Sequence, residues 1–289
     1  MTAARRSDGP QATVGTLVAA ERDGLTRAGD DGGSAPVIVL TYAHAGGARL
    51  QALLSMHPAL TCTTGTGLLA ACDQAAAAWR QADGRPRAPM SPLAKSSVRG
   101  LATAMMTAIV ARTGKRRWCE TAAAERSAAE TFLTLFPNTR FVCLHRACPD
   151  VIVATLRASP WGLNGVAYAA YTAIHPASTV AALAAWWVDR TRPLLAFEEA
   201  HPESCLRVRY ENLTAEPGKI ERDILAFLGL DARGPWLPEP PGEDGQKTAA
   251  ADIPGGMEDL PVGQIPAPLL VQVNELSSML GYPQLNRGV

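Results

Sequence analysis

The feature that most constrains the fold is an apolar run, residues 35–41, that leads into a glycine-rich turn. The run reads Ala-Pro-Val-Ile-Val-Leu-Thr and carries no charge, as is typical of a strand buried on both faces of a parallel sheet. Gly46 and Gly47 then turn the chain, and residues 48–56 place leucines at helical spacing before Pro58. A strand, a tight turn and a helix are therefore predicted in that order.

The same alternation continues to the end of the chain. Further strands are predicted at 117–119, 140–144 and 206–209, and helices at 92–111, 123–136, 150–156, 179–199, 219–228 and 268–280. Strands separated by helices imply an α/β fold with a central, mostly parallel sheet flanked by helices on both faces. We expect a single domain over 35–289 after a flexible N-terminal arm over 1–34, with a long wrapping loop over 231–266.

Two of the predicted helices carry large apolar residues whose positions can be anticipated. On helix 92–111, the apolar residues expected to face the core are Leu101, Met105, Met106 and Ile109. On helix 179–199, Trp186 and Trp187 are adjacent, so at most one of them is expected to reach the core, where packing is the default role.

Charge and cysteine content exclude several kinds of partner. Lys plus Arg and Asp plus Glu each number 27, so the net charge is zero. No overall field attracts nucleic acid or a membrane surface, and phosphate binding has to be local. We see neither a signal peptide nor an apolar stretch of transmembrane length. The six cysteines lack zinc-site spacing, so no metal is expected, and a reducing, cytoplasmic location is predicted.

The turn after the first strand, residues 42–49, lies where open α/β sheets bind ligands. A glycine-rich turn entering a helix presents backbone N–H groups and the positive end of the helix dipole to an anion. The loop of nucleotide triphosphatases, GxxxxGK[ST], is absent because no lysine follows the glycines. Taken alone, Gly46-Gly47 is an ordinary tight turn at least as often as a phosphate cradle.

Residues 40–62, LTYAHAGGARLQALLSMHPALTC, give this turn a wider context. They resemble the opening of sulfotransferases that use PAPS (3′-phosphoadenosine 5′-phosphosulfate), especially the branch that includes the tyrosylprotein sulfotransferases. Gly46 falls on the loop glycine of that family, and His57-Pro58 falls on its His-Pro motif. The resemblance implies a sulfotransferase fold and PAPS as the co-substrate.

Further blocks follow in the order that the family has them. Residues 136–151 are similar to its second signature, in which a strand-end arginine holds the 3′-phosphate, and Arg146 takes that place. The alternative for Arg146 is a structural ion pair with Asp150. Residues 206–213 and the closing segments extend the resemblance to about residues 36–283.

The resemblance assigns the nucleotide to a set of loop and strand-end residues, although several differ from the family pattern. His44 stands where the family has arginine or lysine, and the loop hydroxyls are absent. Thr155 is a possible substitute for the serine that binds the 3′-phosphate, and Arg49 is either a source of positive charge or a solvated residue. The residues expected to bind the cofactor are Ala45, Gly46, Gly47, Ala48, Arg49, Arg146 and Thr155.

Two residues are candidates for catalysis. His44 can donate a hydrogen bond when protonated or accept a proton when neutral. Glu120 stands where the family often has lysine, which reverses the charge, and it is a candidate acid–base residue. The alternative for Glu120 is solvation or pairing with Arg116 or Arg117. If the carboxylate faces the sulfate, Glu120→Lys is expected to improve PAPS binding.

The expected function is sulfuryl transfer from PAPS to a hydroxyl or amine of a small-molecule acceptor. Two alternatives remain open: a diverged member that catalyses a non-sulfating reaction or only binds a ligand, and an interaction protein that keeps the fold as a scaffold. His175, with Tyr168 and Tyr171, is a candidate for lining the acceptor pocket. The sequence leaves the acceptor and the oligomeric state open.

Overall fold

The computed structural model describes residues 35–84, 86, 88–159, 162–163, 166–231 and 261–286. Within these ranges five strands form one sheet, in the order β2-β3-β1-β4-β5, and every neighbouring pair is parallel. The strands are β1 (Val37–Thr41), β2 (Leu60–Thr64), β3 (Arg117–Ala123), β4 (Arg140–His145) and β5 (Cys205–Arg209). The predicted α/β class is confirmed. The predicted arm and most of the predicted loop 231–266 lie outside the described residues.

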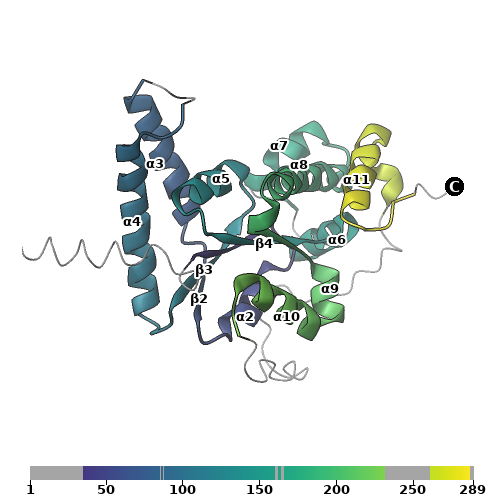
Figure 1. Ribbon diagram of the computed structural model, residues 1–289. Coiled ribbons are helices and arrows are strands. Elements are labelled where there is room, and N and C mark those ends of the chain that lie inside the picture. Colours follow the sequence, from purple (N-terminus) through teal and green to yellow (C-terminus); the bar gives the residue numbers. More distant parts are fainter. Residues whose placement is uncertain are drawn as a thin grey trace, which may run out of the picture.

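Helices lie on both sides of the sheet (Figure 1). One face packs against α2 (Gly47–Ser55), α9 (Tyr210–Ala215) and α10 (Pro217–Leu228). On the other side are α3 (Leu68–Ala82), α4 (Pro92–Ala111), α5 (Arg126–Leu135), α6 (Cys148–Ala158), α7 (Val166–Ile174), α8 (Thr179–Ala200) and α11 (Ala267–Met279). Two 3₁₀ turns, η1 (Pro202–Ser204) and η3 (Val262–Gln264), precede β5 and α11.

Successive side chains of each strand supply two separate cores. In β1, Val39 packs against the α2 side, whereas Leu40 packs against the α8 side, because strand side chains alternate between the faces of a sheet. Both faces of β1 are buried, so its run of apolar residues does not alternate with polar ones. The uninterrupted apolar pattern of 35–41 thus reflects the central position of β1.

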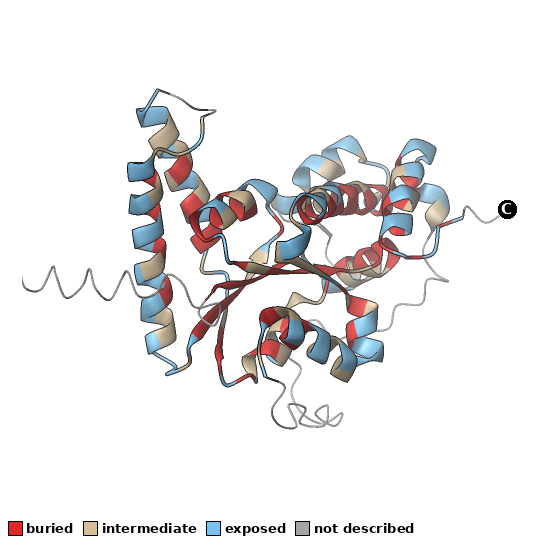
Figure 2. Ribbon diagram, in the orientation of Figure 1, coloured by how far each residue is buried: buried red, intermediate tan, exposed pale blue. Residues whose placement is uncertain are grey.

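The α8 helix is the most enclosed helix of the structure, as the red ribbon in Figure 2 shows. It contacts α5, α6, α7 and α11 as well as β4 and β5. Trp186 and Trp187 are both buried, at 4% and 0% exposure, so the prediction that at most one reaches the core is wrong. Adjacent residues point in different directions from a helix. Because α8 is packed on several sides, both directions lead into the core.

The α4 helix has the predicted bounds but only part of the predicted facing. Its buried residues include Val98, Ala102 and Met106, whereas Leu101 is 68% exposed and Met105 is 40% exposed. Figure 2 shows α4 at the edge of the molecule with its outer side exposed. The prediction for Leu101 and Met105 is wrong, because small residues such as Ala102 allow the helix to approach α3 closely and occupy its inner stripe.

Several elements were not predicted. They are β2, whose Leu-Thr-Cys-Thr-Thr is only weakly apolar, and α3, α7 and α9. The alanine-rich α3 lacks a strong apolar period, but alanine has the highest intrinsic helix propensity. The helix predicted at 123–136 begins at Arg126 instead, because Ala123 still pairs with Thr41 as the last residue of β3.

Among the helices of the described ranges, none combines the length and the apolar content that crossing a bilayer requires.

Candidate functional site

The carboxyl ends of the five strands meet at one edge of the sheet, because all the strands are parallel. The loop 42–46 leaves β1 at this edge, Arg146 follows β4 and Tyr210 follows β5. Thr41 is paired with Ala123, and His145 is paired with Arg209. Segments far apart in the sequence therefore come together where α/β sheets bind ligands.

The loop after β1 takes two left-handed residues to turn into α2. His44 has φ 62° and Gly46 has φ 96°, and the Ala45 N–H donates to the Tyr42 carbonyl over 3.2 Å. Gly46 is the N-cap of α2, and no side chain caps the helix there. The N–H groups of the first turn of a helix lack intrahelical partners, so this end of α2 offers donors and a positive dipole to an anion.

Close neighbours explain why both loop positions are glycine. A Cβ at Gly46 would lie 2.1 Å from the ring of Tyr210, and one at Gly47 would lie 2.9 Å from Cγ2 of Thr41. Both separations are shorter than real Cβ contacts allow. The predicted turn is therefore a tightly packed turn, and Tyr210 covers its glycine.

Arg146 extends from the end of β4 to this loop. Its Nη1 donates to the His44 carbonyl over 3.0 Å, and its guanidinium lies over the Tyr210 ring, 4.4 Å from the centroid. Its Nε is buried and has no hydrogen-bond partner among the described residues. The structure thus brings the predicted 3′-phosphate arginine and the predicted phosphate loop together, and the loop, not Asp150, receives its hydrogen bond.

Two aromatic side chains hold the backbone of Arg146. The Tyr42 hydroxyl donates to the Arg146 carbonyl over 3.2 Å and accepts from the Arg146 N–H over 3.1 Å. Trp187 Nε1 donates to the same carbonyl over 3.0 Å. Burial raises the pKa of Tyr42 to about 12, against the lowering effect of its bond to Arg146. Sequence analysis assigned no role to Tyr42, and this bracing depends on contacts between β1, β4 and α8.

His44 is half-buried at the turn. Burial, and secondarily the positive charge of Arg146, lower the pKa of His44 below its usual 6.5. The imidazole is therefore neutral at pH 7 and has a lone pair with which to accept a proton. Of the two roles that the sequence left open, proton acceptance is the one that this environment favours.

Glu120 points to the face of the sheet opposite α2, the face that Ile38 and Trp118 share. It is 1% exposed, and its carboxylate accepts from the Thr63 hydroxyl and from both the N–H and the hydroxyl of Thr66, the latter two over 2.9 Å. The two alternatives raised for Glu120 were solvation and pairing with an arginine. Its side chain is buried and its partners are threonines, so neither applies. Glu120 instead ties the chain that follows β2 to β3.

Thr121 is the β3 residue that faces the loop. Its Cγ2 lies 3.3 Å from the Cβ position of Gly47, and its Oγ1 is buried with no partner among the described residues. Sequence reasoning chose Glu120 instead. The signal that identifies Thr121 is the twofold alternation along β3, since Trp118 and Glu120 share one face whereas Cys119 and Thr121 share the other.

The remaining residues predicted to bind the cofactor differ in their burial and in their distance from the loop along the chain. Ala45 is buried within it, and Ala48 and Arg49 are exposed in the first turn of α2. Thr155 is fully buried in α6, and its hydroxyl donates to the Val151 carbonyl over 2.7 Å. Its only O–H proton is therefore used within its own helix.

Glu211 connects the late motifs to the N-terminal end of α6. It accepts from the Ala147 N–H over 3.0 Å and from the Tyr282 hydroxyl over 2.8 Å, and the guanidinium of Arg209 lies over the Tyr282 ring at 4.2 Å. The blocks 206–213 and 280–282, noted separately in the sequence, thus form one support beside Arg146.

Glu198 links a buried histidine of β4 to a partly exposed arginine of β5. His145 Nε2 is 2.6 Å from Glu198 Oε1, and Arg207 Nε donates to Glu198 Oε2 over 2.5 Å. His145 is fully buried. It therefore belongs to the packing between β4, β5 and α8.

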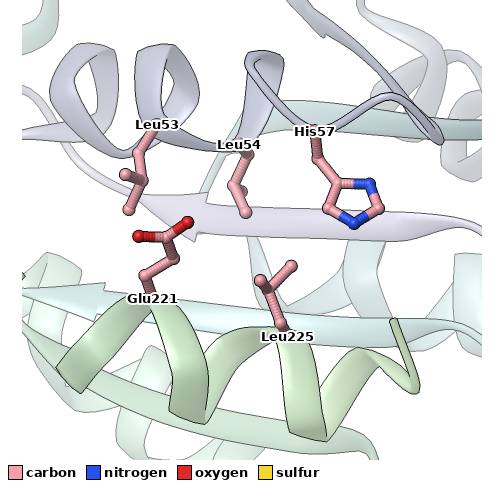
Figure 3. Close-up of a pocket in the computed structure, with 5 residues that line it drawn as sticks. All are labelled: Leu53, Leu54, His57, Glu221 and Leu225. Carbon is pink, nitrogen blue, oxygen red and sulfur yellow. The ribbon is translucent and has the colours of Figure 1, made fainter. Parts of the chain in front are cut away.

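A small cleft lies between α2 and α10, lined by Leu53, Leu54, His57, Glu221 and Leu225 (Figure 3). His57 lies beyond the C-terminal end of α2, whereas the glycine loop lies at its N-terminal end. The His57 Nδ1 accepts from the Ala59 N–H over 3.1 Å. This cleft is therefore separate from the loop, and His57 lies just beyond a helix end.

The other two histidines lie at helix ends as well. His175 is half-buried just beyond α7, where its N–H donates to the Tyr171 carbonyl over 2.9 Å. His201 caps the end of α8, and its ring packs at a tilt of 54° against Phe197, with ring centroids 4.9 Å apart. In the part of the chain that the structure describes, no group of His, Cys, Asp and Glu residues is arranged to hold a metal ion.

Comparisons with known proteins agree with this architecture. Three solved structures with similar folds are a sulfotransferase domain from the curacin biosynthetic pathway (TM-score 0.54, 14% identity, 87% of this chain and 99% of that chain), a sulfotransferase domain from the Synechococcus PCC 7002 olefin synthase (0.52, 18%, 86% and 96%) and a sulfotransferase from Alicyclobacillus acidocaldarius (0.50, 14%, 86% and 96%). At these identities the likeness establishes the fold. A search of curated proteins found no match.

A family profile extends the comparison from fold to sequence. The profile described as the sulfotransferase family matches residues 36–234, which hold all five strands, the glycine loop, Arg146 and Tyr210. The match spans well over half of the 289 residues. The chain therefore belongs to the sulfotransferase family.

Proposed function

We propose that this protein transfers a sulfuryl group from PAPS to a hydroxyl or amine of a small molecule. The observation that carries the proposal is the meeting of the uncapped N-terminus of α2 with Arg146 at one sheet edge. An uncapped helix end and a guanidinium are two independent anion-binding groups. A nucleotide with two separate phosphates matches this pair better than one with a single phosphate.

The residues present fit such a nucleotide. Three buried polar atoms without partners among the described residues surround the loop: Thr121 Oγ1, Arg146 Nε and Tyr210 Oη. Buried polar atoms are normally hydrogen-bonded, so unpartnered ones near an anion site are available to ligand oxygens. In this proposal the N–H groups of the α2 end hold the 5′-phosphate, and Arg146 holds the 3′-phosphate.

PAPS supplies an activated sulfuryl group, and the protein has to place it and remove the acceptor's proton. Sulfuryl transfer resembles phosphoryl transfer, in which positioning and charge neutralisation do most of the work. The neutral imidazole of His44 accepts the proton from the acceptor hydroxyl or amine in this proposal. Glu120, held by Thr63 and Thr66, positions the chain after β2 and takes no part in proton transfer.

Nucleotide binding is tested by calorimetric titration with adenosine 3′,5′-bisphosphate and with adenosine 5′-monophosphate. We expect the bisphosphate to bind at least tenfold more tightly, since a charge-assisted hydrogen bond contributes about 1.5–3 kcal/mol. Arg146→Ala should remove this preference, whereas Arg222→Ala, an exposed position on α10, should preserve it. Equal affinities for the two nucleotides in the wild type would refute the 3′-phosphate site.

The role of His44 is tested by the pH dependence of radiolabelled sulfate transfer from PAPS to a panel of alcohols and amines. Because the pKa of His44 is lowered below 6.5, the base is available at pH 7 and turnover should fall with acid only below pH 6.5. His44→Ala should abolish turnover and retain bisphosphate affinity, and His201→Ala, beyond the C-terminal end of α8, should have little effect. Unchanged turnover in His44→Ala would reduce His44 to a loop residue.

One observation favours the alternative of a diverged, non-sulfating member. The loop positions Ala45, Gly47 and Ala48 offer no side-chain hydroxyl, and the hydroxyl of Thr155 is used within α6. Losing a preorganised donor typically lowers the rate by roughly 10²–10³. Bisphosphate binding that depends on Arg146, without sulfate transfer to any acceptor of the panel, would support this alternative.

A further inference from the structure

Two cysteines face one another across the edge of the sheet. Cys62 in β2 and Cys119 in β3 are directly paired residues of neighbouring parallel strands. Both side chains belong to the core on the α2 side, and each thiol affects the pKa of the other. Cys119 is fully buried, whereas Cys62 is partly exposed. The pair therefore combines an accessible thiol with a protected one.

The register brings these residues within reach of a disulfide bond. Neighbouring strands lie about 4.7–4.9 Å apart, which is inside the range of about 4.4–6.8 Å between the Cα atoms of bridged cysteines. Side chains of directly paired residues point the same way. Because the Cβ atoms of bridged cysteines lie about 3.5–4.5 Å apart, the two strands have to approach each other slightly. Among the strands that the structure describes, β2 is an edge strand paired with β3 alone, and it can make this small movement without disturbing a second one.

The surroundings of Cys62 favour its reactive form. The neighbouring Cys119 thiol, together with the positive charge of Lys115, lowers the pKa of Cys62, although burial opposes this. Lys115 is held there because its Nζ donates to the carbonyls of Ser55 over 2.8 Å and His57 over 3.2 Å. The thiolate is the nucleophilic form of cysteine. Cys62 is thus prepared to attack an oxidant first.

We propose that Cys62 and Cys119 form a redox-active dithiol, which hydrogen peroxide oxidises to a reversible disulfide across β2 and β3. The Cys62 thiolate attacks one peroxide oxygen, the O–O bond breaks, and hydroxide leaves, which yields a sulfenic acid. The sulfur of Cys119 then attacks the sulfur of Cys62 as its proton passes to the departing oxygen, and the S–O bond breaks. Two thiols and one peroxide give one disulfide and two waters.

A second cysteine pair provides an internal comparison. Cys143 in β4 and Cys205 in β5 also have neighbouring thiols, but Cys205 is paired with Phe141 and Cys143 with Arg207. This pair is therefore two residues out of register. Diagonal neighbours of this kind lie about 7–8 Å apart, beyond the usual disulfide range. Oxidation should therefore select Cys62 and Cys119.

The test treats the reduced full chain with hydrogen peroxide, blocks the remaining thiols with iodoacetamide and maps the peptides without reduction. We expect the protein to lose the mass of two hydrogen atoms, the Cys62 peptide to be joined to the Cys119 peptide, and dithiothreitol to reverse both changes. Cys205→Ser should form the same link. Cys119→Ser should leave a sulfenic acid at Cys62 that dimedone traps.

Several outcomes would overturn the proposal, and the wild-type map alone can reveal them even if a variant fails to fold. A link between Cys143 and Cys205, or between two copies of the chain, would contradict the selectivity that the register predicts. Sulfinic acid at Cys62 without any link would show that Cys119 does not resolve the sulfenic acid. Six alkylated thiols after peroxide treatment would show that the pair is not redox-active.

Discussion

At the residue scale, the loop after β1 makes its key contacts through glycines, which have no side chain, and through its backbone. Gly46 and Gly47 leave room for Tyr210 and Thr41, and Arg146 bonds to the loop backbone at His44. The glycine turn was predicted from the local strand-turn-helix pattern, and Arg146 was predicted from the resemblance to the sulfotransferase family. Tyr210 as a cover and Thr121 as a neighbour were not predicted, because their positions depend on strand pairing.

Substituting Gly46 by alanine should reveal the Tyr210 contact. The left-handed φ costs a non-glycine residue about 1–2 kcal/mol, and overlap with the ring should add about 1–3 kcal/mol. Gly67→Ala is the matched control, because Gly67 is also a left-handed N-cap but has open space around its Cβ position. The free energy of unfolding from urea titrations checks the difference.

The double variant Gly46→Ala with Tyr210→Ala isolates the clash from the backbone strain. If the ring is the obstacle, removing it should recover the extra loss, and the two substitutions should be non-additive. Equal losses in Gly46→Ala and Gly67→Ala would mean that Tyr210 moves aside without cost.

Glu120 should behave as a structural carboxylate. Glu120→Gln replaces an acceptor of three hydrogen bonds and should cost about 1–3 kcal/mol in unfolding free energy, and Glu120→Lys should cost more because it buries an unpaired charge. Glu120→Lys is therefore expected to destabilise the fold, and the expectation that it improves PAPS binding is withdrawn.

Glu125→Gln is the control for these variants. It removes an exposed ion pair with Arg190 and should cost less than about 1 kcal/mol. Lost turnover in Glu120→Gln with unchanged stability would instead support a catalytic role.

At the scale of elements, helix and strand positions were predicted well where an apolar period is strong. The bounds of α4 agree with the prediction, whereas β2 and α3 were missed because threonine and alanine give little hydrophobic contrast. The facing of α4 was partly wrong, since the apolar residues of this helix extend around more of its circumference than one packed stripe needs. Propensity determines whether such a helix forms, but its neighbours determine which side is buried.

Adjacent methionines on α4 provide a direct test of this facing. Met106 is buried, so Met106→Ala should lower the free energy of unfolding by about 2 kcal/mol or more. Met105 is 40% exposed, and Met105→Ala should change it by less than about 0.5 kcal/mol. Urea denaturation of the two variants compares the same substitution one residue apart. Equal losses would show that both sides of α4 are packed.

At the scale of the whole molecule, two cores on either side of one parallel sheet bury several groups that ionise only at high pH. Burial raises the pKa of Tyr42 from 10 to about 12, and burial with the charge of Asp73 raises the pKa of Cys72 from 9 to about 11. In both cases the folded protein holds its proton more tightly than the unfolded chain does. Their contribution to stability is therefore present below the unfolded pKa and lost as pH rises through the folded one.

The midpoint of urea unfolding should accordingly decline between pH 9 and pH 12. Tyr42→Phe should be less stable than the wild type at pH 8, because it loses the bonds to the Arg146 backbone. It should lose less stability between pH 10 and pH 12, because one titrating group is gone. A parallel decline in the wild type and the variant would contradict this assignment.

Short local patterns in the sequence predicted the α/β class, the parallel sheet and the glycine turn, and the resemblance to a known family pointed to Arg146. The tertiary structure decided which side chains reach the turn. Strand pairing placed Thr121 toward Gly47 and Glu120 toward Thr66, and the enclosure of α8 buried both tryptophans. The same pairing set Cys62 opposite Cys119. Local patterns record the propensity of a segment, but contacts between distant segments depend on register and packing, which no single segment encodes.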